Sequence, residues 1–466
     1  MTIPFRFTAA LFVSAAVYLG SAFAADWPGF RGPRGSGVSE EKKLPLPTGK
    51  DDVLWKTKLP GPGASGPIAL GDKLFVTCYT GYGAKFSAGF GKGGFGKGGF
   101  GKGGFGGFGK PDPAELKAQE KLRFALLCVD ASKGDVIWQK EVEPKLPEVV
   151  FGGMIREHGY ATSTPVTDGE RVYVFFGKSG VVAFDLGGKQ LWRVSVGKGT
   201  NFFGMASSPV LYKDLVIVNA NIESGALVAL DKKSGEEVWR AKVAGASWGS
   251  PVLADVGTGQ ELVVSMPDKV IGFDPADGKE LWHCKGIKTG GGFGGFGGGP
   301  GGGYGGTYST PATQKGVVYV SGGGGPAGPP TALAVRAGGR GNVDDSHVLW
   351  RKQAGTSYSS PLIVGDHLYF VDGSVTCLRT DTGKQVYKER LYESRGEYVS
   401  PVAVGDKLVV LTRFDGLFVL AAGATFEQLA AHEFAGDKSI FNAGPAIANG
   451  RIYARSNEYL YCLGKK

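Results

Sequence analysis

The chain is poor in the residues that hold metals or build redox centres. It has 466 residues but only 5 cysteines, 5 histidines and 4 methionines. No cysteines stand in a CxxC or CxxCH pattern, and the histidines lack the spacing typical of metal ligands. The sequence therefore predicts no metal site, and it gives no support for covalent haem attachment or for a zinc knuckle.

Long apolar runs are also scarce. The only one, Leu11–Leu19, follows Arg6 and precedes the small-x-small sequence Ser21–Ala24, and it is too short to span a bilayer. We expect residues 1–24 to be a signal peptide cleaved after Ala24. The mature chain is then exported to the periplasm or the cell exterior without a transmembrane segment. A net charge of +9 is mild for this length and predicts no nucleic-acid partner.

Glycine, in contrast, is abundant, with 80 residues, against an average of about 7%. It gathers in two tracts, predicted as insertions at 83–110 and 289–306, and it keeps no three-residue period, which excludes collagen. The first tract repeats a five-residue unit in which lysines alternate with phenylalanines, and we expect it to be disordered. It either binds an anionic envelope polymer or a protein, or serves as a spacer. The repeated residues are Lys92, Lys97, Lys102, Phe95, Phe100 and Phe105.

An internal repeat predicts the fold. Each unit opens with a small residue and a proline, continues through four short apolar segments, and in most copies ends in tryptophan. Four short strands in about 40–50 residues are typical of a propeller blade. After an N-terminal arm at 25–49, we therefore expect an all-β, eight-bladed propeller of four-stranded antiparallel blades over residues 50–466. The opening prolines are Pro67, Pro165, Pro209, Pro251, Pro311, Pro361, Pro401 and Pro445.

The two ends of the chain complete one blade. The last repeat lacks its fourth segment, while an unmatched segment of that kind stands at Asp52–Lys56. We expect this N-terminal strand to close the ring and to remove an exposed sheet edge. Six tryptophans share the terminal position of the repeat, with Tyr387 in the seventh, and are expected to dock on neighbouring blades. They are Trp55, Trp138, Trp192, Trp239, Trp282 and Trp350.

The end of the repeat carries a family resemblance. The element A-x-D-x-x-(S/T)-G-x-x-x-W, seen as ALDKKSGEEVW, resembles the tryptophan-docking repeat of the quinoprotein (PQQ-like) propellers. These include the PQQ-dependent alcohol dehydrogenases and the propeller subunit of the outer-membrane assembly machinery. The resemblance implies eight blades. Residues 336–350 and 421–430 depart from the motif, so we expect those blades to be less regular at the outer rim.

The resemblance also implies a test for catalysis. The PQQ dehydrogenases carry an adjacent cysteine pair over the cofactor and a Glu/Asn/Asp set that holds Ca²⁺. This chain has no adjacent cysteines, and no acidic set matches the calcium ligands. Cys128, Cys377 and Cys462 replace an alanine of the repeat, as small buried residues do, whereas the disulfide state of Cys78 and Cys284 stays open. We predict no catalytic residues and no cofactor, with PQQ and calcium as the alternative.

One face of the predicted propeller receives the largest insertions. The two glycine tracts, the segment 144–160 and the segment 321–330 all fall between the second and third strands of a blade or between blades. Those connections emerge on the same face, and loops on a rigid scaffold commonly carry binding sites. The serines before the blade prolines recur in most blades, which is typical of a scaffold.

Aromatic residues mark the same face. Trp248, Tyr308, Tyr358 and Tyr398 stand three residues before consecutive blade prolines, where the other blades have small or polar residues. The rings either plug the top of the channel or form a stacking wall for a flat or sugar-like ligand. Nearby, Arg156, Glu157 and His158 are candidates for polar contacts with that ligand.

These observations predict an exported, non-catalytic scaffold that binds a protein or an anionic envelope polymer through the long-loop face, as a monomer or within a complex. The alternatives are a PQQ-dependent dehydrogenase acting on alcohols or sugars and a carbohydrate-binding module. In the arm, we expect Trp27 and Phe30 to hold the chain against the propeller surface.

Overall fold

The computed structural model describes residues 26–44, 46–47, 52–84, 112–152, 155–201, 203–288, 306–323, 328–392 and 397–465. The predicted signal peptide, nearly all of both glycine tracts and the side chain of Glu157 lie outside the described residues. The predictions for those segments therefore stay predictions.

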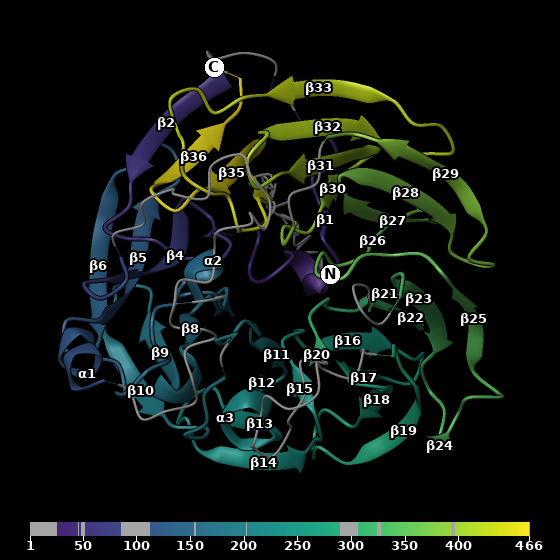
Figure 1. The fold of residues 1–466 in the computed structure, drawn as a ribbon, viewed down its shortest axis with the longest axis horizontal. Coiled ribbons are helices and arrows are strands. Elements are labelled where there is room, and N and C mark those ends of the chain that lie inside the picture. The colour runs from purple at the N-terminus through teal and green to yellow at the C-terminus, as the bar shows by residue number, and fades with distance from the viewer. Residues whose placement is uncertain are drawn as a thin grey trace, which may run out of the picture.

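Eight four-stranded antiparallel units form a closed ring, as the repeat predicts (Figure 1). Within each blade the chain runs outward from the axis, so the first strand of the blade is innermost and the fourth is outermost. The first four blades are β3 (Ile68–Leu70), β4 (Lys73–Thr80), β5 (Arg123–Asp130), β6 (Val136–Val142); β7 (Val166–Thr167), β8 (Arg171–Phe175), β9 (Val181–Asp185), β10 (Gln190–Val194); β11 (Val210–Tyr212), β12 (Leu215–Ala220), β13 (Ala226–Asp231), β14 (Glu237–Lys242); and β16 (Val252–Asp255), β17 (Gln260–Met266), β18 (Lys269–Phe273), β19 (Glu280–Lys285).

The remaining blades repeat the pattern with one change at the end. They are β21 (Ala312–Gln314), β22 (Val317–Gly322), β23 (Thr331–Arg336), β25 (Val348–Lys352); β26 (Leu362–Val364), β27 (His367–Asp372), β28 (Ser374–Arg379), β29 (Gln385–Arg390); β30 (Val402–Val404), β31 (Lys407–Leu411), β32 (Leu417–Ala421), β33 (Gln428–His432); and β34 (Ala446–Ala448), β35 (Arg451–Arg455), β36 (Tyr459–Leu463), β2 (Val53–Lys58).

The eighth blade is closed by the N-terminal strand, which confirms that prediction. β2 pairs antiparallel with β36, placing Trp55 opposite Cys462 and Thr57 opposite Leu460. The blades then bury one another on both faces, so the middle strands read as continuous apolar runs such as LVIVNA in β12. The cores lie between neighbouring blades, and the largest joins the first, seventh and eighth blades across the closure.

Short elements decorate the ring. They are α1 (Pro113–Gln119), α2 (Ile155–His158), α3 (Asn221–Ser224), η1 (Pro33–Gly35), η3 (Gly177–Ser179), the parallel pair of β15 (Ala246–Ser247) with β20 (Gly306–Thr307), and β24 (Gly341–Asn342) on the edge of the fourth blade. Among the described helices, none has the length and apolar character to cross a membrane.

The outer-strand tryptophans bridge neighbouring blades. Five indole N–H groups donate to a main-chain carbonyl that follows the third strand of the next blade, and the ring covers the glycine of the same turn. This contact locks the angle between two blades with both apolar area and a hydrogen bond. The bonds join Trp55 to Ala131 (3.1 Å), Trp138 to Leu186 (3.1 Å), Trp192 to Lys232 (3.1 Å), Trp239 to Pro275 (3.1 Å) and Trp350 to Thr380 (2.9 Å).

Trp282 differs from the other five. Its indole N–H donates to Glu261 Oε2 of its own blade at 2.6 Å. Glu261 is buried and also accepts from the Gly338 N–H and from Arg340 Nη1. The turn of the next blade, where the motif departs at 336–350, is thus held by a carboxylate instead of a docking carbonyl.

The docking of Trp239 on its turn predicts that alanine substitution destabilises the protein far more at Gly278 than at Gly257. Gly278 (φ +73°) and Gly257 (φ +79°) share a left-handed backbone, but a Cβ at Gly278 would lie 2.5 Å from the Trp239 ring, whereas nothing lies within 4 Å at Gly257. We expect Gly257→Ala to cost about 1 kcal/mol, as backbone strain alone does. Gly278→Ala should cost about 1–3 kcal/mol more by displacing the indole. Urea denaturation of both variants measures this, and equal losses would contradict the docking role.

The N-terminal arm fills the lower channel. Trp27 forms an antiparallel bridge with Ala69, and β1 (Val38–Ser39) pairs parallel with β30, so residues 26–39 enter and leave the ring as a hairpin (Figure 1). Trp27 is only 2% exposed. We expected Trp27 and Phe30 to hold the arm against the outer surface of the propeller. This expectation is wrong about the location, because both residues lie inside the ring and line the axial channel. We call residues 26–39 the plug.

Candidate functional site: the axial chamber

An axial chamber of about 180 Å³ remains above the plug. Its wall is formed by the eight segments that precede the blade prolines, and its floor is formed by Trp27, Phe30 and Arg31. Because each segment leads down into an innermost strand, the position three residues before the proline lies nearer the mouth than the position directly before it. The mouth opens on the face that carries the connections between blades.

The four predicted aromatic residues line one side of this chamber, in contact with one another. Trp248 stacks on Tyr308 with ring centroids 5.1 Å apart, Tyr308 contacts Tyr358 at 5.1 Å, and Tyr358 contacts Tyr398 edge-on at 5.0 Å. Phe203, from the loop before the third blade, covers Trp248 at 5.4 Å. One face of Trp248 and one face of Tyr308 are therefore occupied by the other ring, whereas the other pairs meet at a tilt or edge-on.

The last ring of this row has a cationic neighbour. The Arg413 guanidinium lies 4.5 Å from the centre of the Tyr398 ring, and its Nε donates to Asn442 Oδ1 at 2.9 Å. Beside it, burial raises the pKa of Glu397 to about 7. Arg413 and Glu397, each only 3% exposed, form a polar cluster behind the wall and are not among its lining residues.

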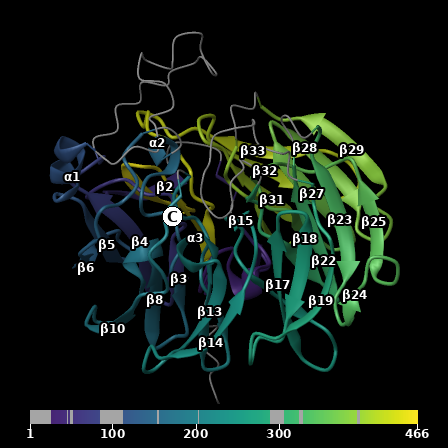
Figure 2. The same cartoon turned by 60° about the horizontal axis from the view of Figure 1, so that its bottom comes forward.

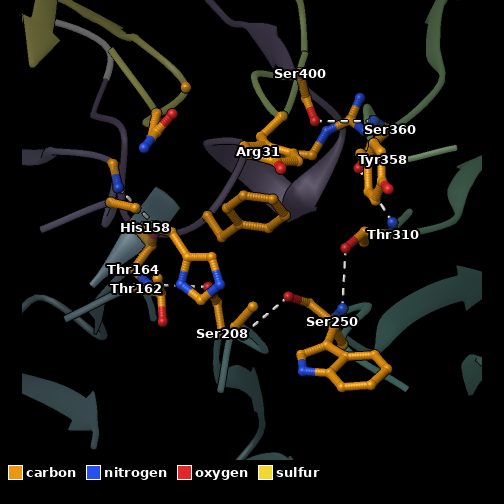
Figure 3. Close-up of a pocket in the computed structure, with 18 of the residues that line it drawn as sticks. Arg31, His158, Thr162, Thr164, Ser208, Ser250, Thr310, Tyr358, Ser360 and Ser400 are labelled. Atoms are coloured by element: carbon orange, nitrogen blue, oxygen red, sulfur yellow. Dashed lines mark hydrogen bonds between the residues drawn. The ribbon is translucent and has the colours of Figure 1, made fainter. Parts of the chain in front are cut away.

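Below the rings, hydroxyl groups form a belt around the axis (Figure 3). In six successive steps, the N–H of the residue before a blade proline donates to the hydroxyl of the equivalent residue in the next blade. The steps are Gly66 to Thr164 (2.9 Å), Thr164 to Ser208 (3.0 Å), Ser208 to Ser250 (2.9 Å), Ser250 to Thr310 (2.9 Å), Thr310 to Ser360 (3.1 Å) and Ser360 to Ser400 (2.9 Å).

The hydroxyl belt is interrupted at the closure. The two remaining positions are Gly444 and Gly66, which have no hydroxyl to accept from Ser400 and Gly444. In the described part of the chain, the N–H groups of Ser400 and Gly444 thus have no acceptor. Both residues line the chamber.

The floor carries a buried cation. Arg31, 4% exposed, donates from Nη2 to the carbonyls of Pro361 (2.6 Å) and Ser36 (3.3 Å), while Nε and Nη1 are buried without a partner. Burial lowers the pKa of Arg31 to about 10, so the group stays charged at neutral pH. Figure 3 shows its side chain extending from the plug toward Ser360 and Ser400.

The predicted polar trio of α2 is divided. His158 lines the chamber, whereas Arg156 is exposed and is not among the lining residues. The sequence reasoning missed Arg31, Phe203 and the donors of the belt. The sequence Trp27–Gly35 was the available signal, because two arginines between glycines and prolines are unusual in a buried segment.

The chamber does not fit calcium-bound PQQ. Among its described lining residues there is no Asp or Glu, whereas Ca²⁺ is held by several oxygen ligands that usually include carboxylates. The five cysteines are free and buried, as predicted for Cys128, Cys377 and Cys462, so none forms a disulfide over the chamber. The volume is also small for a tricyclic quinone.

A second, smaller cavity of about 30 Å³ lies between the first three blades. It is lined by two carboxyl groups whose pKa values are raised by burial, to about 8 for Glu223 and about 7 for Glu148. Glu148 accepts from the Ser179 hydroxyl at 3.3 Å. These groups give the scaffold an element away from the axis whose stability contribution is lost as the pH rises.

Part of the chain resembles a known family in sequence. Residues 121–258 match the family model described as outer membrane protein assembly factor BamB. Over 96 residues the chain is 36% identical to the factor of that name from Burkholderia pseudomallei, a match that covers 20% of this chain and only 22% of the relative.

Two solved structures share the fold. BamB from Moraxella catarrhalis aligns with a TM-score of 0.52 at 16% identity, over 72% of this chain and 91% of that chain. A quinohemoprotein alcohol dehydrogenase from Pseudomonas putida aligns with a TM-score of 0.54 at 11% identity, over 95% and 80%. As its repeat predicts, the chain is thus an eight-bladed β-propeller. Its residues 121–258 are similar in sequence to BamB, and its repeat motif resembles that of the PQQ-like propellers.

Proposed function

We propose that the chain is an exported, non-catalytic scaffold that binds a protein partner through its long-loop face. This face is formed by the connections between blades and by those between the second and third strands of each blade. The opposite, short-turn face carries the tight turns within blades and the entry of the plug. Figure 2 shows α1 and α2 together on the upper side of the ring, which is the long-loop face.

The observation that carries this proposal is a group of three exposed apolar side chains on loops of this face, in addition to those exposed on the outer strands. Leu116 (37% exposed) in α1, Leu146 (39%) and Val150 (36%) stand on connections of the long-loop face. α1 is fixed to the connection between the first and second blades, which carries Leu146 and Val150. Two hydrogen bonds join Gln119 to the main chain of Glu148, at 2.8 and 2.9 Å. Exposed apolar groups on a rigid support are typical of protein interfaces. We call these three residues the α1 patch.

The similarity to an assembly factor supports the same conclusion. The matched segment 121–258 contains Leu146 and Val150. The alternatives are less well supported by the axial chamber. A PQQ-dependent dehydrogenase needs a calcium site, and the described lining offers no carboxylate for one. A carbohydrate module of the expected kind needs free ring faces, and Trp248 and Tyr308 are stacked on each other.

Site-specific photo-crosslinking tests the proposal. The protein is expressed in its native host, with a photo-crosslinking amino acid in place of Leu146. It should then form a discrete covalent adduct with one envelope protein. Leu116→Ser combined with Val150→Ser should reduce that adduct by about tenfold, since apolar anchors commonly contribute 1–2 kcal/mol. Val238→Ser is the matched control, because Val238 is 52% exposed but lies on the outer strand β14.

The Val238→Ser control distinguishes binding at the α1 patch from nonspecific apolar adsorption elsewhere on the surface. An adduct that survives in the double variant, or that disappears equally in Val238→Ser, would contradict binding through the α1 patch. Dye reduction by the purified protein with PQQ and Ca²⁺ would contradict the non-catalytic assignment.

A further inference from the structure

The axial chamber has an excess of hydrogen-bond donors and positive charge. Its described lining includes Arg31 and His158 but no Asp or Glu. In the described part of the chain, no protein acceptor receives the O–H of any of the six belt hydroxyls, because each serves only as an acceptor from the preceding blade. Such a wall favours a ligand that brings acceptors and negative charge.

Arg31 supplies charge that nothing in the described structure balances. No carboxylate of the described residues pairs with it, and two of its nitrogens are buried without a partner. An unpaired cation in a dry interior is costly, and its attraction for an anion is poorly screened there. A second buried guanidinium, Arg455, donates only to neutral groups, namely Ser65, the Thr77 carbonyl and Cys78. Arg31 is thus the guanidinium that makes the chamber electropositive, because Arg455 is not among its lining residues.

The break in the hydroxyl belt provides a place for the anion. Ser400 and Gly444 present main-chain N–H groups without a described acceptor, in neighbouring blades on the side of the axis that Arg31 approaches. In the belt each of these N–H groups is directed toward the equivalent position of the next blade. Main-chain N–H groups and a guanidinium are common partners of a carboxylate. Gly444 leaves the space that a side chain fills in most other blades, because a Cβ there would meet only the Ser400 carbonyl oxygen, at 3.8 Å.

We propose that the axial chamber binds a small aromatic monocarboxylate, with its carboxylate at the break between Ser400 and Gly444 and its ring beneath the aromatic side of the mouth. Arg31 balances the charge from the floor. The chamber volume of about 180 Å³ is on the order of the ~150 Å³ engineered cavity that accepts benzene, so the ligand is a single ring. The chamber opens on the same long-loop face, but its lining shares no residue with the α1 patch.

Calorimetric titration with benzoate and with its neutral isostere benzamide tests the proposal on the wild-type protein. We expect saturable benzoate binding, and at least about tenfold weaker binding of benzamide, as expected from loss of a charge-assisted hydrogen bond. Benzoate should also raise the melting temperature, and benzamide should not. Equal binding of the two compounds, or no benzoate binding at millimolar concentration, would overturn the proposal.

Two variants locate the carboxylate. Arg31→Met should weaken benzoate binding by at least about tenfold, while Arg31→Lys, which keeps the charge, should lose less. Gly444→Ser should also weaken binding, because its hydroxyl would accept the Ser400 N–H and close the belt. A Cβ at Gly444 meets nothing nearer than the Ser400 carbonyl oxygen at 3.8 Å, so this variant should fold with unchanged or higher melting temperature.

The variants also separate this inference from the scaffold function. If Gly444→Ser and Arg31→Met bind benzoate like the wild type, the carboxylate site is wrong, whatever the crosslinking at the α1 patch shows. Loss of crosslinking in the α1 patch variants with unchanged benzoate binding would support two separate sites.

Discussion

Replacing Trp239 by alanine should destabilise the protein by about 3–5 kcal/mol, which is typical of large-to-small changes at buried aromatic sites. The side chain is 8% exposed, covers Gly278 and donates to the Pro275 carbonyl at 3.1 Å. The substitution removes the apolar contact and leaves that carbonyl without its bond. Urea denaturation followed by circular dichroism measures the loss.

The neighbouring residue is the control for this experiment. Val238 precedes Trp239 in β14 but is 52% exposed, so Val238→Ala should change the stability by no more than about 0.5 kcal/mol. Comparable losses for the two variants would mean that the third and fourth blades are not held together by the indole.

The second large effect is on pH dependence. Burial raises the pKa of Glu223 from 4.5 to about 8, and repulsion from Glu148 adds to the shift. The folded protein thus holds a proton that the unfolded chain releases above pH 4.5. This contribution to stability is fully present below pH 4.5 and is lost as the pH rises toward 8, at about 1.4 kcal/mol per unit of pKa difference.

Glu223→Gln should therefore flatten the decline of the melting temperature between pH 5 and pH 8.5, since its neutral amide does not ionise. Its stability relative to the wild type should rise with pH by a few kcal/mol. Glu236→Gln, at an exposed position, should leave the wild-type slope intact. Parallel melting curves of wild type and Glu223→Gln across this range would refute the assignment.

The blades were predictable because each repeats the same physical requirements. Every copy needs a tight entry at the crowded axis and a docking contact at the rim, so proline and tryptophan recur at fixed positions. The closing strand could be predicted because Asp52–Lys56 supplies what the copy ending near Cys462 lacks. The irregular contact at the rim between Trp282 and the next blade was also predictable, because residues 336–350 depart from the motif. The role of the Glu261 carboxylate, which accepts from Trp282, was not predictable.

The chamber was predictable only in its upper part. The four aromatic residues are equivalent positions of the repeat, so the repeat placed them together. The plug occurs once, and a segment without periodicity gives no indication of where it lies. The serines before the prolines were correctly interpreted as scaffold, since their hydroxyls accept from neighbouring blades, as Ser250 does from Ser208. Their second capacity, as donors into the chamber, depends on hydrogen positions that no repeat pattern reveals.

The pairing of β2 with β36 also sets the order of assembly. The strand that closes the ring is near the start of the chain, while its partner ends at Leu463, so closure joins residues almost the full chain length apart. Such contacts are slow to form. A chain emerging from a ribosome or a translocation pore can stack its early blades, but it keeps an open sheet edge until its last strand is released. Ring closure therefore has to wait for β36, and the open ring before that pairing is the state most exposed to aggregation or to capture by a chaperone.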